Sequence, residues 1–139
     1  MYQKTTIVGH LGNDPEMRYS PTGAPVTHFS VASNRRWTTD EGETSEETVW
    51  FRVTAWRRLA EICNGYLIKG RQVFVEGRLQ PDPETGGPRV WVGDDGNARA
   101  QFEITANRVI FLGKGDGERP ADALPNAPST PREDDLVPF

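Results

Sequence analysis

Residues 49–67 read VWFRVTAWRRLAEICNGYL, and the hydrophobic period changes in the middle of this stretch. Up to residue 56 every second side chain is a core-type apolar residue, which is the period of a β-strand with one buried face. From Leu59 onward the apolar residues recur every three or four positions, which indicates an amphipathic helix. The sequence therefore predicts a strand over 48–57 that runs into a short helix, with Lys69 and Gly70 as its C-terminal signal.

Strand-like segments lie on both sides of this stretch. Before it, strands are predicted over 4–12 and 24–36, with turn clusters at 13–15 and 20–23 and a polar, acidic hairpin tip over 38–47. After it, strands are predicted over 71–80 and 99–112, with a hairpin tip over 81–88, a short segment at 89–92 and a tight turn at 93–96.

The order of elements is three strands, one helix and then two or more strands. This order predicts an all-β protein with the OB fold, a five-stranded Greek-key barrel with one short helix between strands 3 and 4. A β-sandwich is the alternative architecture, although sandwiches rarely contain a helix in mid-chain. Residues 1–113 are predicted to form this domain. Residues 114–139 are rich in glycine and proline and poor in apolar side chains, so we expect a disordered tail there.

Charge is unevenly distributed along the chain. The formal net charge is −4, yet residues 1–115 hold 14 basic and 14 acidic residues, whereas residues 116–139 hold two basic and six acidic ones. The body of the protein is therefore neutral and can carry a basic face despite the acidic total.

Several classes of protein are disfavoured by the composition. The single cysteine, Cys63, excludes an intramolecular disulfide and a cysteine-rich zinc site. His10 and His28 are isolated from other metal-ligand types, so neither a metal nor another cofactor is predicted. No motif of a hydrolase, metalloprotease or phosphate-binding loop is present, and we expect a protein that is not an enzyme. No apolar run could span a membrane and no targeting segment is recognisable, which favours a cytoplasmic protein without a membrane partner.

The strand over 48–57 carries the strongest functional signal. Its core face leaves Trp50, Arg52 and Trp56 together on the outer face. Aromatic rings interleaved with arginine suit single-stranded nucleic acid, because bases stack on the rings and phosphates meet the cations. The alternative is that both indoles lie beneath a loop or a subunit interface.

Further candidates for binding a single DNA strand lie near this strand or repeat its pattern. Arg35, Arg36 and Trp37 end the second strand, and Arg57 opens the helix, where a phosphate would relieve unfavourable positive charge. Trp91 is either a further stacking platform or a residue packed on a neighbouring strand. The full set of candidates is Trp37, Trp50, Trp56, Trp91, Arg35, Arg36, Arg52, Arg57, Lys4 and Arg18.

Five motifs in this order resemble the bacterial single-stranded DNA-binding protein family. They are IVGHLGNDPEMRY at 7–19, WFRV at 50–53, LAE at 59–61, YLIKG at 66–70 and VFVEG at 73–77. The resemblance implies an OB fold, a homotetramer and the coating of strands exposed in replication, recombination and repair. It also implies stacking roles for Trp37, Trp50 and Trp56. The family has a fourth tryptophan in a later hairpin, where this chain has Pro81 to Glu84, so either Trp91 replaces it or the contact is missing.

The last six residues match the family's acidic, apolar-tipped terminus except that leucine replaces an aspartate. The resemblance implies that this tip docks on replication and repair proteins. The residues concerned are Asp134, Asp135, Leu136, Val137, Pro138 and Phe139. A different class of function is an OB module that only binds proteins, such as a primosome-like adaptor, and tight binding to a DNA strand alone would distinguish the two.

Overall fold

The structure is a computed structural model that describes residues 1–113, which form eight strands and one helix. The elements are β1 (Thr5–Leu11), β2 (Glu16–Tyr19), β3 (Pro25–Thr38), β4 (Thr44–Trp56), α1 (Arg57–Tyr66), β5 (Gln72–Leu79), β6 (Val90–Val92), β7 (Ala98–Ala100) and β8 (Phe102–Leu112). At ten residues α1 is far too short to cross a bilayer, and the described part of the chain contains no longer helix.

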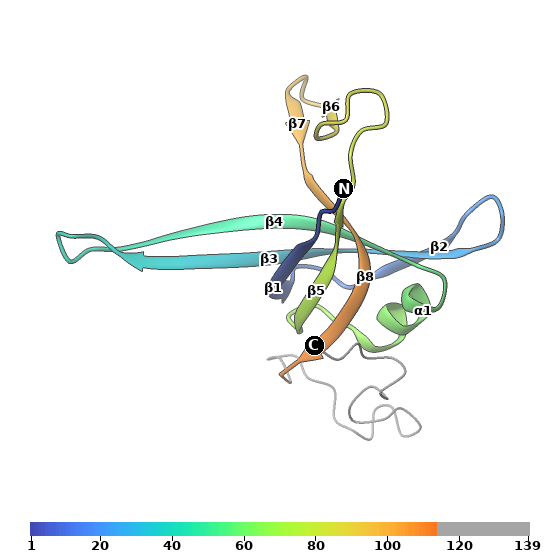
Figure 1. Ribbon diagram of the computed structural model, residues 1–139, viewed down its shortest axis with the longest axis horizontal. Helices are drawn as coiled ribbons and strands as arrows, with labels where there is room; N and C mark the ends of the chain where they lie inside the picture. Colours follow the sequence, from blue (N-terminus) through green and yellow to red (C-terminus); the bar gives the residue numbers. More distant parts are fainter. Residues whose placement is uncertain (114–139) are drawn as a thin grey trace.

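The strands close into a barrel, which confirms the predicted OB fold. The sheet order is β1-β5-β8-β4-β3-β2, and β1 also pairs with β3 through His10↔Ala32 and Leu11↔Val31. β4 and β8 run parallel, and the other pairs are antiparallel. The five main strands are β1, β3, β4, β5 and β8, with α1 between the third and fourth of them. Figure 1 shows the barrel with the small β6–β7 ribbon projecting beyond one end.

The core consists of the inward residues of the barrel and the buried side of α1. Phe29, Val53 and Ile104 are almost completely buried in it, and α1 adds Ala60 and Cys63. The buried Thr27 hydroxyl donates a hydrogen bond to the Ala60 carbonyl oxygen at 2.7 Å, which fixes the helix against β3. Burial raises the pKa of the Cys63 thiol to about 12, so the thiol stays protonated and has the structural role expected of a core cysteine.

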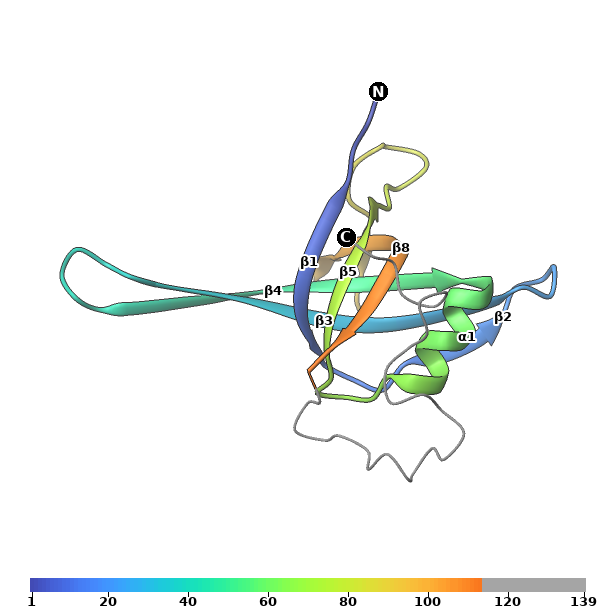
Figure 2. The same cartoon turned by 60° about the horizontal axis from the view of Figure 1, so that its bottom comes forward.

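The β3–β4 hairpin is longer than the sequence predicts. Residues 38–47 were expected to form a polar tip, but β3 runs to Thr38 and β4 starts at Thr44, so only 39–43 make the turn. Two ion pairs across the strands, Arg35–Glu47 and Arg36–Glu46, replace the missing apolar pairing there. The hairpin therefore extends well beyond the barrel, as both Figure 1 and Figure 2 show.

Two smaller predictions were also wrong, and one short strand was not predicted. The two predicted turn clusters before residue 24 flank this strand, β2, which pairs with β3. α1 ends at Tyr66, and Gly70, with φ +89°, instead turns the chain into β5 while its N–H donates to the Leu11 carbonyl oxygen at 2.9 Å. The expected strand over 99–112 is divided at Gln101, because β7 pairs with β6 whereas β8 pairs with β5 and β4.

Candidate nucleic-acid interface

The outer side of β4 carries two half-exposed tryptophans on one face. Trp50 is 51% exposed and Trp56 is 45% exposed, so both indoles face outward and about half of each is open to solvent. The register places His28 of β3 opposite Thr54 and therefore on this face. We call this surface the aromatic face and define it by Trp50, Arg52, Thr54, Trp56 and His28. The two tryptophans are six positions apart along an extended strand, or about 20 Å, a distance that several nucleotides can span.

The Trp50 ring is positioned by the turn that follows β1. A Cβ atom at Gly12 would overlap the indole of Trp50, so the ring lies directly on the glycine backbone. Hydrogen bonds fix this turn to β3: the Gly12 N–H donates to the Ser30 carbonyl oxygen at 2.9 Å, and the Ser30 N–H donates to Asn13 Oδ1 at 3.0 Å. Sequence reasoning missed Gly12, because the contact joins residues 38 positions apart.

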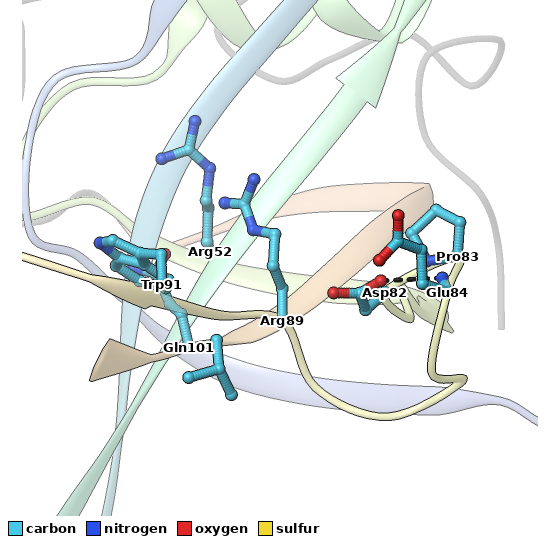
Figure 3. Close-up of a pocket in the computed structure, with 8 residues that line it drawn as sticks. Arg52, Asp82, Pro83, Glu84, Arg89, Trp91 and Gln101 are labelled. Atoms are coloured by element: carbon cyan, nitrogen blue, oxygen red, sulfur yellow. Dashed lines mark hydrogen bonds between the residues drawn. The ribbon is translucent and has the colours of Figure 1, made fainter. Parts of the chain in front are cut away.

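A groove of about 750 Å³ adjoins the aromatic face at Arg52. We call it the arginine groove; its lining residues are Arg52, Asp82, Pro83, Glu84, Arg89, Val90, Trp91 and Gln101. In Figure 3 the guanidinium groups of Arg52 and Arg89 point the same way, with Trp91 on one side of them and Asp82 and Glu84 on the other.

One carboxylate lies near both arginines of this groove. Glu103 Oε2 lies 3.3 Å from Arg89 Nε, and Glu103 Oε1 lies 4.0 Å from Arg52 Nε. The Arg89 guanidinium carbon also lies 5.6 Å from the centroid of the Trp91 ring, at cation–π distance. The groove therefore combines two cations with one aromatic ring, 38% exposed, next to the aromatic face.

The structure places Trp37 on the long hairpin, but not on the same face as Trp50. Along β3, Trp37 and Arg35 alternate in phase with the core residue Val31, so they occupy the opposite face of the two-stranded ribbon. The Arg35 guanidinium carbon lies 4.5 Å from the centroid of the Trp37 ring. Arg35 and Arg36 are also paired with Glu47 and Glu46 at 3.1 and 2.9 Å, so both cations already have partners in the chain.

Arg57 and Arg18 flank the Trp56 end of the aromatic face. Arg57 has a left-handed backbone, φ +58°, at the corner where β4 becomes α1. The first turn of α1 has no side-chain cap and no acidic residue, so its amide groups and Arg57 make this corner positive. Arg18 lies opposite Val26, which in turn lies opposite Trp56.

Lys4 belongs to a different wall of the barrel, so its prediction as a DNA contact is not supported. Its Nζ atom lies 2.9 Å from Glu76 Oε1, and the same carboxylate oxygen lies 3.5 Å from Arg108 Nε. Glu76 lies on β5, Arg108 lies on β8 and Lys4 directly precedes β1, so this cluster is away from the aromatic face. The Lys4 ammonium therefore neutralises a largely buried carboxylate.

His28 is a second residue of this surface that sequence reasoning did not select. Its Nδ1 atom lies 3.0 Å from the Thr54 hydroxyl oxygen. Partial burial lowers the pKa of His28 below its usual value, and the nearby Arg52 and Arg18 lower it further, against the opposing effect of Glu103 and Glu16. Within residues 1–113 no group of three or more histidine, cysteine or carboxylate side chains is placed to hold a metal ion.

Comparison with protein families gives a match over residues 2–112 to the single-strand binding protein family. This chain belongs to that family. The family resemblance seen in the motifs is thereby confirmed, and the OB barrel described above is the part that matches.

Two similar proteins are named as single-stranded DNA-binding proteins. The chain is 42% identical over 110 residues to the single-stranded DNA-binding protein of Neisseria meningitidis, which covers 79% of this chain and 59% of that relative's length. It is 39% identical over 135 residues to single-stranded DNA-binding protein 1 of Chlorobaculum tepidum, covering 93% of this chain and 78% of the relative.

Two solved structures of the family have the same fold. The small single-stranded DNA-binding protein of Streptomyces coelicolor is 28% identical, with a TM-score of 0.65, and the match covers 79% of this chain and 94% of that one. The Plasmodium falciparum SSB in complex with ssDNA is 26% identical, with a TM-score of 0.66, over 81% of this chain and 97% of that one. The predicted tail over 114–139 and its tip at Asp134 to Phe139 lie outside the described residues.

Proposed function

We propose that this protein binds single-stranded DNA without sequence preference and that binding, rather than catalysis, is its activity. The observation that carries the proposal is the aromatic face, where Trp50 and Trp56 are half exposed on one strand with Arg52 between them. Every base has a π-face on which an indole can stack, so such a surface is tolerant of sequence. Duplex DNA hides these faces, and a preference for single strands follows.

In this mechanism the tryptophans bind bases and the arginines bind phosphates. Stacking contributes about 1–3 kcal/mol per base. Trp50 and Trp56 lie along β4 and Trp91 extends the path into the arginine groove, whereas Trp37 offers a separate stacking site on the opposite face of the hairpin. The arrangement supports the alternative in which Trp91 replaces the family's missing hairpin tryptophan, because Trp91 lies in one groove with Arg52.

Phosphates then compete with carboxylates for the arginines. The 4.0 Å separation between Arg52 and Glu103 is long for an ion pair, so a phosphate oxygen can approach Arg52 at little cost. Arg57 and Arg18 provide further phosphate contacts at the Trp56 end of this path, and Arg35 and Arg36 provide them on the hairpin. Because each neutralised phosphate releases counterions, affinity falls as salt rises.

Replacing Trp50 with alanine tests the stacking role. We expect Trp50→Ala to weaken binding to oligo-dT by about 1–3 kcal/mol and to reduce the quenching of tryptophan fluorescence on titration. Tyr2→Ala is the control, because Tyr2 is exposed but precedes β1 and lies outside the aromatic face. Unchanged affinity and quenching in Trp50→Ala would contradict the stacking role. A wild-type chain that does not bind oligo-dT at all would instead favour a protein-binding OB module.

We also propose that the chain forms a homotetramer and acts in replication, recombination and repair on cytoplasmic DNA, recruiting partner proteins through Asp134 to Phe139. Self-association is supported by the outer wall of the barrel, where Val8, 44% exposed, lies opposite Phe74. Light scattering gives the mass in solution, and a monomer would contradict the tetramer.

Loss of partner binding on deletion of residues 116–139, with the DNA affinity retained, is the result expected of a recruiting tip.

A further inference from the structure

We propose that His28 is a DNA contact at the centre of the aromatic face and that its imidazole takes up a proton when a phosphate group arrives. This inference rests on the proposed function, because it concerns the same surface. The proposed role of His28 is therefore neither metal binding nor packing in the core.

The position of His28 is set by the register of β2, β3 and β4. It lies opposite Thr54 on β4 and opposite Glu16 on β2, between the row that holds Arg52 and the row that holds Trp56. Neighbouring rows of one face are about 7 Å apart along a strand. A DNA strand that stacks on both tryptophans must therefore cross His28, which places its sugar–phosphate groups within reach of the imidazole.

The hydrogen bond to Thr54 fixes the orientation of the ring. His28 Nδ1 and the Thr54 hydroxyl oxygen are 3.0 Å apart, and no other hydrogen bond of this ring is formed within residues 1–113. The Nε2 atom is therefore available for a ligand. Since Thr54 can either donate to Nδ1 or accept from it, the same contact is compatible with the neutral ring and with the protonated one.

Four charged side chains face His28 from the strands around it. Arg18 and Glu16 lie on β2, Arg52 on β4 and Glu103 on β8. Partial burial and the two arginines lower the pKa of His28, and the two carboxylates oppose them without cancelling them. The ring is consequently neutral at physiological pH while no DNA is bound.

A bound phosphate reverses this balance. Its negative charge stabilises the imidazolium directly and also offsets the repulsion from Arg52 and Arg18, so the pKa of His28 rises in the complex. The DNA-bound form then holds the proton more tightly than the free form. Affinity must therefore increase as pH falls, and a difference of one pKa unit gives at most about a tenfold gain.

The primary test measures the affinity of the full chain for oligo-dT between about pH 8 and pH 5.5 at constant salt, a range in which histidine is the side chain that normally titrates. Wild type is expected to gain about three- to tenfold in affinity as pH falls. His28→Asn keeps a polar side chain without the titration, so its affinity should change much less. His10→Asn removes the other histidine, which is exposed on β1, and should keep the wild-type pH dependence.

A second measurement does not depend on the folding of a His28 variant. Because the sequence holds two histidines, His10→Asn leaves His28 as the only imidazole signal in a proton NMR titration. The titration midpoint of that signal should be below the usual value in the free chain and should rise on saturation with oligo-dT. A midpoint that stays constant or falls on DNA binding would overturn the inference, as would equal pH dependence in wild type and His28→Asn.

These outcomes separate the inference from the function on which it rests. If wild type binds oligo-dT tightly but His28 shows no linkage, the proposed function stands and His28 has only its structural contact with Thr54. If wild type fails to bind oligo-dT at every pH, the proposed function itself is wrong, and the inference falls with it.

Discussion

Gly12 controls the position of a neighbouring side chain although it has none of its own. The Trp50 indole lies on its backbone, and the hydrogen bonds of Gly12 and Asn13 to Ser30 prevent the turn from moving away. A half-exposed tryptophan would otherwise sample several rotamers and would lose that freedom on stacking. If a base stacks on Trp50 as proposed, the glycine reduces the entropy cost of binding it.

Gly12→Ala should displace the Trp50 ring without unfolding the barrel, because the ring is free to move outward into solvent. We expect stability to change little and affinity for oligo-dT to fall by about threefold, or ~0.6 kcal/mol, which is less than the ~1–3 kcal/mol lost when a stacking ring is removed. Gly65→Ala is the matched control, since a Cβ there meets nothing within 4 Å. Affinity that is unchanged in Gly12→Ala would show that the glycine does not position the ring.

At the scale of single residues, the sequence predicted what a local period can predict. The alternation over 49–56 placed Trp50, Arg52 and Trp56 outward. In a strand that packs on the core, the alternate apolar side chains face inward, so the side chains between them must face outward. Gly12 and His28 could not be found in this way. Their contacts with Trp50 and Thr54 depend on the register between strands that are far apart in the sequence.

The β3–β4 hairpin shows the same limit at the scale of elements. Its outer half was interpreted as a loop because residues 38–47 are polar, and polarity normally favours turns and loops. The strands persist because Arg35 and Arg36 face Glu47 and Glu46 across the ribbon, and complementary charges stabilise a ladder as apolar pairs do. The helix and the inner strands, in contrast, follow the apolar period and were predicted to within a few residues.

Removing the two carboxylates should make the hairpin arginines available to DNA. In Glu46→Gln/Glu47→Gln we expect affinity for oligo-dT to rise several-fold at low salt, because each exposed pair is worth about 0.2–1 kcal/mol and phosphate no longer has to displace it. Glu41→Gln/Glu43→Gln is the control: it removes the same charge near the hairpin tip, where neither residue forms an ion pair within residues 1–113. An equal gain in both variants would attribute the effect to long-range charge alone, and a loss would show that the carboxylates position the arginines.

The formal net charge of the whole chain is negative, and a negative charge repels a polyanion such as DNA. Residues 1–115 are neutral in sum and carry the aromatic face and the arginine groove, whereas residues 116–139 hold six acidic and two basic residues. We therefore expect the DNA strand and the acidic segment to compete for the same cations whenever both are within a Debye length. This competition weakens with salt, because the screening distance falls from about 10 Å at 0.1 M to about 3 Å at 1 M.

Deleting residues 116–139 should leave DNA affinity unchanged or raise it, with the largest gain at low salt. The contacts with phosphates remain, so a plot of log affinity against log salt should keep a slope of about −0.7 for each phosphate engaged once salt is high enough to screen the deleted segment. Replacing Glu133, Asp134 and Asp135 with amides in the full chain separates charge from length, and we expect it to reproduce most of the gain. A truncated chain that binds oligo-dT more weakly at every salt concentration would mean that the segment contributes to the DNA site instead of competing for it.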